Sequence, residues 1–86
     1  MDNIISNAKL NITFNGCNGD LPDPVNFDAS DEELLRIASE AIQTGYVPGI
    51  PADLSASLVD FVVDRFAATS DLPNRCMIRA KTPFGK

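Results

Sequence analysis

Oxygen-bearing side chains in one short stretch come closest to forming a chemical site in this 86-residue chain. The oxygens considered are those of Asn18, Asp20, Asp23 and Asp28. Calcium binds oxygen ligands of this kind. However, their spacing does not follow the pattern of a calcium-binding loop, and Pro22 and Pro24 interrupt it. We interpret them as turn-forming residues that face solvent, and we expect no metal site.

Most catalytic chemistry is excluded by composition, because the chain has no histidine and two cysteines. Histidine is the commonest general base and zinc ligand, and two cysteines alone do not make a structural zinc site. Neither a phosphate-binding glycine loop nor a dinucleotide-binding motif occurs. Paired carboxylates would still need a cleft, which so small a domain seldom encloses. The sequence therefore predicts a protein that is not an enzyme and has no cofactor.

Asp53, Asp60 and Asp64 fall on one side of a helix predicted over residues 52–67. Asp60 and Asp64 are four residues apart, and like charges at that spacing cost a few tenths of a kcal/mol. These carboxylates either mark a partner surface or form the solvated side of an amphipathic helix. Arg65 falls at the edge of the apolar side of this helix. Either its aliphatic stem covers the core while its charged end stays in water, or the apolar residues around it form an interface.

The last twelve positions hold four of the seven basic residues: Arg75, Arg79, Lys81 and Lys86. We predict a mobile tail over residues 82–86, in which Phe84 would fill a partner's pocket. Alternatively, Phe84 folds back onto the core and the cations balance an acidic domain. The candidate protein-binding residues are Arg79, Lys81, Phe84, Gly85, Asp53, Asp60 and Asp64.

Regular elements must position these side chains. Alternating apolar residues predict a strand over 9–14, which Asn15-Gly16 ends, and Asn18-Gly19 indicates a second turn. Ser30 and Glu33 form a capping box that starts a helix over 31–44.

We further predict the helix over 52–67, a strand over 75–81 and a short edge strand over 25–27. The expected fold is a single α+β domain over 1–86, with a loose segment at 1–7. Strands 9–14 and 75–81 pair in one sheet, and both helices cover one face. The predicted core is Leu10, Ile12, Phe14, Leu34, Ile37, Ala38, Ala41, Leu58, Val62, Phe66 and Ile78.

The net charge of −5 argues against direct nucleic-acid binding and permits a basic partner surface. The sequence has neither an apolar stretch of about 20 residues nor a signal peptide, so we expect a cytoplasmic protein without membrane contact. Free thiols at Cys17 and Cys76 fit that compartment. The alternative, a disulfide between them, would require adjacent strands.

Three stretches resemble the small protein C of PRTRC systems: Phe14-Asn15-Gly16, Leu21-Pro22-Asp23-Pro24 and Ser30-Asp31-Glu32-Glu33. That family belongs to the prokaryotic ubiquitin-like proteins, and the resemblance implies a β-grasp fold and an adaptor or modifier role in a mobile-element system. Two features depart from it. A helix over 52–67 stands where a ubiquitin-like sheet has strands, and Lys86 follows Gly85, so conjugation through glycine would require trimming.

The leading hypothesis is a non-enzymatic adaptor or ubiquitin-like module that binds another protein, with a homo-oligomer left open. The alternative is a small acidic inhibitor that presents carboxylates to a basic nucleic-acid-binding surface of a defence or DNA-processing enzyme.

Overall fold

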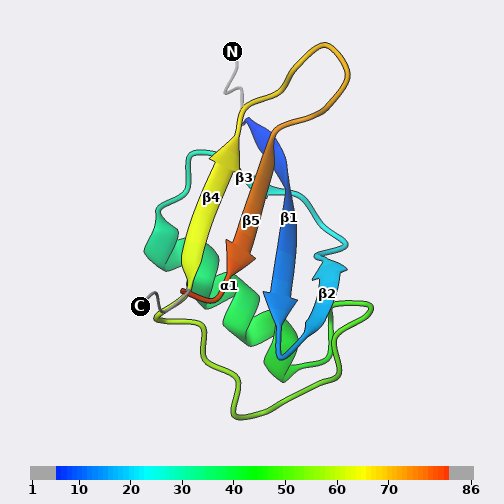
Figure 1. Cartoon of the computed structure of the whole chain (residues 1–86), viewed down its shortest axis with the longest axis vertical. Coiled ribbons are helices and arrows are strands. Elements are labelled where there is room, and N and C mark those ends of the chain that lie inside the picture. Colours follow the sequence, from blue (N-terminus) through cyan, green and yellow to red (C-terminus); the bar gives the residue numbers. More distant parts are fainter. Residues whose placement is uncertain (1–5, 82–86) are drawn as a thin grey trace.

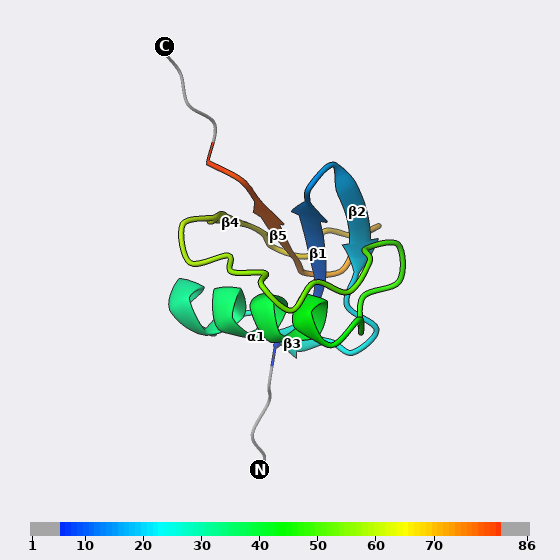
Figure 2. The same cartoon turned by 90° about the horizontal axis from the view of Figure 1, so that it is seen from below.

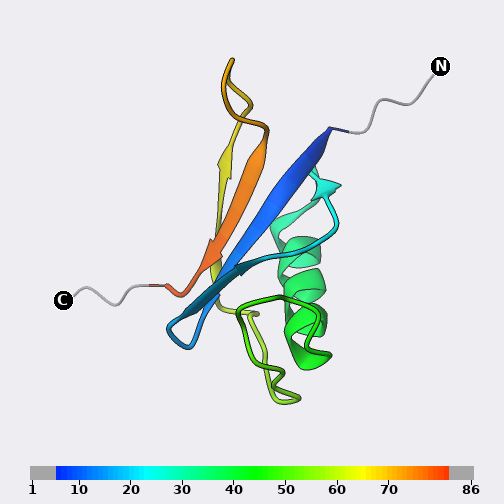
Figure 3. The ribbon, with the colours of Figure 1, turned by 90° about the vertical axis from the view of Figure 1, so that its right-hand side faces the viewer.

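The computed structural model describes residues 6–81, which form an α+β domain. Its elements are β1 (Asn7–Phe14), β2 (Cys17–Asp20), β3 (Val25–Asn26), α1 (Asp31–Gln43), β4 (Val62–Phe66) and β5 (Arg75–Arg79). The sheet has the strand order β2-β1-β5-β4, and β3 pairs with β1 (Figure 1). The helix packs across one face of the sheet, and no other described element covers the opposite face (Figures 2 and 3).

Two parallel strands form the centre of the sheet. Leu10 lies opposite Cys76 and Ile12 opposite Ile78, and all four side chains are buried against α1. The predicted pairing of the first and last strands is therefore confirmed, although the strands extend over 7–14 and 75–79. Asn7 belongs to β1, so the predicted loose segment ends before it.

The second strand, β2, was not predicted. Asn15 and Gly16 both have positive φ and form the expected turn, but Asn18 and Gly19 continue into a strand that pairs with β1. Asn11 and Asn18 exchange side-chain hydrogen bonds across this pair, at 2.9 and 3.0 Å. β2 consists of Cys17, Asn18, Gly19 and Asp20, so it lacks the alternating apolar residues that would have predicted a strand.

The predicted helix over 52–67 is wrong, and α1 is the one helix among residues 6–81. Residues 62–66 form β4, which pairs antiparallel with β5. The run Phe61-Val62-Val63 is aromatic and β-branched, which favours a strand, and β5 supplies the hydrogen-bonding partner. The predicted helix over 31–44 is confirmed: Ser30 Oγ accepts the Glu33 N–H at 3.1 Å, and Thr44 ends it.

The segment between α1 and β4 fills part of the space assigned to the second helix. It buries four apolar side chains: Val47, Ile50, Ala56 and Leu58. Two side chains of α1 also bond its backbone. Gln43 Nε2 donates to the Ala56 carbonyl at 2.8 Å, and Ser39 Oγ accepts the Leu58 N–H at 2.9 Å.

Most of the predicted core is confirmed, with seven of its residues buried: Leu10, Ile12, Leu34, Ala38, Ala41, Leu58 and Ile78. Phe14 and Ile37 are half-buried against this core. Phe66 is wrong as a core residue, because it is 41% exposed, and Val62 is only half-buried. Both lie on the side of β4 that faces away from α1, as their pairing with Arg75 and Arg79 requires.

Cys17 lies on β2 and Cys76 on β5, with β1 between these strands. The adjacent strands that a disulfide would need are therefore missing, and both thiols are free, as predicted. Cys76 is fully buried, whereas Cys17 is partly exposed. Burial raises the pKa of the Cys76 thiol and so disfavours its reactive thiolate form.

Gly19 approaches the loop at residues 47–49 so closely that a side chain cannot fit. A Cβ there would lie 2.2 Å from the Pro48 carbonyl oxygen. We expect Gly19→Ala to destabilise the fold by about 2–3 kcal/mol through this overlap. Gly16→Ala is the matched control, because its φ of +78 is strained but no atom lies within 4 Å, so about 1 kcal/mol is expected. Urea unfolding measures both, and equal losses would contradict the overlap.

The two thiols should differ in reactivity in the native state. We expect an aromatic disulfide reagent to modify Cys17 quickly and Cys76 only after unfolding, since Cys76 is buried and its pKa is raised. Mass spectrometry before and after urea addition counts the modified thiols. A second thiol that appears only after chemical reduction would contradict the free-thiol assignment.

Candidate functional site

The sheet face opposite α1, here called the open sheet face, presents side chains from four strands. It comprises Lys9, Asn11, Thr13, Asn18, Asp20, Val62, Asp64, Phe66, Arg75, Met77 and Arg79. Strand register fixes their order, because directly paired residues share a face. Asp64 and Asn11 therefore flank Met77, and Phe66 and Lys9 flank Arg75.

Cations and apolar side chains alternate on this face. The Arg75 guanidinium lies 4.9 Å from the centre of the Phe66 ring, which is a cation–π distance. Arg75 Nε is buried and has no hydrogen-bond partner among the described residues. Arg79 Nε donates to Asp64 Oδ2 at 2.7 Å. Met77, which lies between Arg75 and Arg79 along β5, is 36% exposed. The face thus combines a partly exposed apolar centre with positive charge.

Arg79 and Lys81, two of the candidate protein-binding residues, are exposed, and Arg79 lies on the face opposite Ile78. Asp64 joins Arg79 on the open sheet face, which was not expected. Phe84, Gly85 and the predicted mobile tail over 82–86 lie outside the described residues.

Asp53 and Asp60 do not share a helix face with Asp64, because the helix that would have aligned them does not form. Asp53 lies in the loop after α1, where it accepts hydrogen bonds from the Ser55 hydroxyl at 2.6 Å and N–H at 2.9 Å. These bonds hold the pKa of Asp53 below its ordinary value. Asp60 is exposed just before β4. The three carboxylates therefore form no common stripe.

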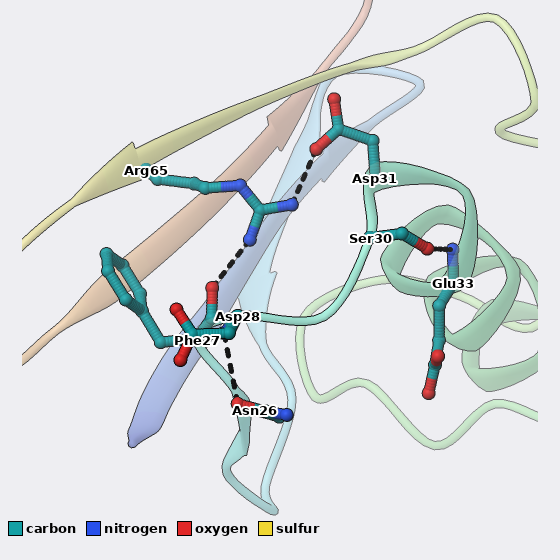
Figure 4. A network of polar contacts seen from close by, with 7 residues as sticks. All are labelled: Asn26, Phe27, Asp28, Ser30, Asp31, Glu33 and Arg65. Atoms are coloured by element: carbon teal, nitrogen blue, oxygen red, sulfur yellow. Dashed lines mark hydrogen bonds and ion pairs between the residues drawn. The ribbon is translucent and has the colours of Figure 1, made fainter. Parts of the chain in front are cut away.

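Arg65 makes contacts that the sequence did not indicate. It projects from β4 toward the start of α1, where Nη1 donates to the Phe27 carbonyl at 2.7 Å and Nη2 to Asp31 Oδ1 at 2.5 Å (Figure 4). Its side chain is 27% exposed. Arg65 thus ties the edge strand to the segment that leads into the helix, and it acts as a structural residue.

A groove of about 480 Å³ lies between α1 and the segment around residues 21–29, and is here called the α1 groove. Its apolar lining includes Leu21, Val25, Ile37 and Ala41. Three carboxylates also line it: Asp23, Glu33 and Glu40. The Tyr46 hydroxyl donates to Asp23 Oδ2 at 2.7 Å and joins two loops at one end. Only the i, i+4, i+7 spacing of Glu33, Ile37 and Glu40 could have suggested this surface.

Within residues 6–81, no three His, Cys, Asp or Glu side chains are grouped closely enough to hold a metal ion. The same part of the chain contains no helix of the length and apolarity needed to cross a membrane. Comparison of the sequence with known protein families and curated proteins, and of the structure with solved structures, gave no match. Arguments about function therefore depend on the surfaces of this chain.

Tyr46 should titrate above its ordinary value, because a hydrogen bond to Asp23 and the charge of that carboxylate raise its pKa. The folded pKa is raised, so the stabilisation from this contact is fully present below about pH 10, the unfolded value, and is lost as pH rises through the folded pKa. Absorbance of tyrosinate measures the midpoint in wild type and Asp23→Asn. We expect a lower midpoint in the variant, and equal midpoints would contradict the contact.

Proposed function

We propose that this protein is a protein-binding adaptor built on a ubiquitin-like, β-grasp domain, and that the open sheet face is its binding surface. The topology supports the domain type: a hairpin, a helix that crosses one face, and a last strand inserted parallel to the first. β4 also supplies a strand in the region where a second helix had been the main departure from the ubiquitin-like resemblance.

The observation that carries the proposal is the uncovered face itself. Met77, Phe66 and Val62 leave apolar surface partly exposed, and polar or charged side chains surround them. Protein interfaces commonly combine an apolar centre with a polar rim in this way. This face carries three cations, Lys9, Arg75 and Arg79, against two carboxylates, Asp20 and Asp64. Because the net charge of the whole chain is −5, this excess of cations is local, and we propose a partner with an acidic contact surface.

The remaining assignments come from the sequence, with the mobile-element setting from the resemblance, and they extend the proposal. Lys81 continues the row of cations beyond β5, and Phe84 and Gly85 would follow it as further contact residues. The proposed setting is a mobile-element system in the cytoplasm. No catalytic role, cofactor or direct nucleic-acid contact is included in the proposal.

The acidic-inhibitor alternative loses the aligned carboxylates first considered, because Asp53, Asp60 and Asp64 form no common stripe. Asp64 is held by Arg79 and Asp53 by Ser55, which leaves Asp60 as a single exposed carboxylate. The acidic surface that favours this alternative lies along α1, where Glu32, Glu33 and Glu40 are exposed. A basic partner bound to these carboxylates of α1 would distinguish the inhibitor alternative from the adaptor proposal, which expects an acidic partner on the open sheet face.

The test starts with a photo-crosslinking residue at Met77, with the exposed loop position Ser57 as control. A protein captured only from position 77 is purified, and its affinity is measured by calorimetry. We expect Arg79→Glu to weaken binding at least tenfold, about 1.4 kcal/mol, because it removes a cation from the contact.

Arg36→Glu is the matched control, since it makes the same charge change and also breaks an exposed ion pair, with Glu40 at 3.4 Å. Binding that is unaffected by Arg79→Glu, or weakened equally by both substitutions, would overturn the open sheet face as the binding surface. Loss of binding only when the carboxylates of α1 are reversed would favour the inhibitor alternative.

A further inference from the structure

The α1 groove has the shape and charge of a peptide-binding site, and we propose that it binds residues 81–86 of a second copy of the chain. In this arrangement Phe84 lies on the apolar floor, and Lys81 and Lys86 approach the carboxylates at the rim. The groove is a different surface from the open sheet face and does not depend on the proposed function. A tail bound in a groove, however, does not at the same time contact the proposed partner, so in self-associated molecules Lys81, Phe84 and Gly85 are withdrawn from that contact.

The floor of the groove is apolar and firmly held. Val25 and Ala41 are each 7% exposed, so they belong to the core, and Leu21 and Ile37 leave part of their side chains accessible above it. A volume of about 480 Å³ accommodates one aromatic side chain and its neighbouring backbone. An apolar anchor in such a pocket is the usual source of binding energy at an interface.

The rim is acidic, and none of the described side chains that line the groove is basic. Glu33 uses its backbone N–H to bond Ser30, and this leaves its carboxylate available to a ligand. Glu40 pairs with Arg36 at 3.4 Å, but both side chains are about 60% exposed, so this surface pair is weak and a ligand cation can compete for it. The third carboxylate of the rim, that of Asp23, accepts a hydrogen bond from the Tyr46 hydroxyl, which fixes its position.

Residues 81–86, Lys-Thr-Pro-Phe-Gly-Lys, are the one stretch of the sequence in which a phenylalanine lies between two lysines without an acidic residue. The segment therefore complements the groove in both charge and polarity. Pro83 restricts the backbone before the anchor, which lowers the entropy lost on binding.

A second copy fits this groove better than the same chain does. β5 ends at Arg79 in the sheet, whereas the groove is lined by α1 and residues around 21–29. The helix and the sheet form two separate layers (Figure 3). The contact would therefore join the tail of one molecule to the groove of the next, which is a heterologous association.

Sedimentation equilibrium of the full chain at rising concentration tests the proposal. We expect self-association that Phe84→Ala weakens at least tenfold and that high salt also weakens, because the rim contacts are ionic. Leu72→Ala is the control, since Leu72 is 47% exposed in a loop away from the groove, and it should leave the association unchanged.

A charge exchange makes the test specific. Glu33→Lys with Glu40→Lys should abolish self-association, and so should Lys81→Glu with Lys86→Glu, with folding of each variant checked by circular dichroism. Mixed together, these two variants should associate again, because each acidic tail then meets a basic groove. A monomeric wild type at millimolar concentration, or a mixture that stays monomeric, would overturn the proposal. Association that persists in Phe84→Ala and is lost in Arg79→Glu would also overturn it and would assign the contact to the open sheet face.

Discussion

The parallel pairing of β1 with β5 is the constraint on which the rest of the structure depends. Parallel strands cannot be joined by a tight turn, so the chain between them must leave the sheet and return to the same end. Here that connection contains α1, the loop after it and β4. Leu10, Ile12 and Ile78 on the central pair are at most 1% exposed and form the surface on which α1 packs. The hairpin partner β2 and the edge strand β4 then extend this pair on either side.

The sheet has two edge strands, β2 and β4, and a different contact fixes each of them to the rest of the domain. The edge strand β2 lies against the loop at residues 47–49, and the close approach of Gly19 to the Pro48 carbonyl holds this cover in place. The opposite edge strand, β4, is anchored by Arg65, whose guanidinium bonds the Phe27 carbonyl and Asp31 at the start of α1. Ion pairs and hydrogen bonds of charged groups keep more of their strength where side chains are partly buried, as Arg65 is. Each edge is thus fixed by a specific contact to the helix side of the molecule.

The sequence predicts an element correctly where its apolar residues fit either a strand or a helix but not both. The prediction is wrong where the same apolar residues fit both patterns. The alternation around Ile12 and the capping box at Ser30 each favour a single structure, and both are confirmed. In the segment 61–66, apolar residues satisfy a helical arc and also a strand, and only the partner β5, distant in sequence, decides between them. Because the helix predicted over 52–67 does not form, Asp53, Asp60 and Asp64 do not share the helix face on which they were expected. The orientation of Arg79 was predictable because it follows from a two-residue period, whereas the contacts of Arg65 join residues 34 and 38 positions apart.

The charge distribution follows from the fold and shapes what the surfaces can do. α1 begins with three consecutive acidic residues, which its dipole favours, and it places Glu33 and Glu40 on the side that lines the groove. The strands carry Lys9, Arg75 and Arg79 on the face that α1 leaves open. A chain with a net charge of −5 therefore gathers three of its seven basic residues on the open sheet face and a row of carboxylates along α1. Since the sheet and its core lie between these surfaces, a ligand on one side does not block the other. That independence is what an adaptor needs in order to hold two chains at once: a groove that is filled by the tail of another copy leaves the open sheet face of the same molecule accessible to a partner.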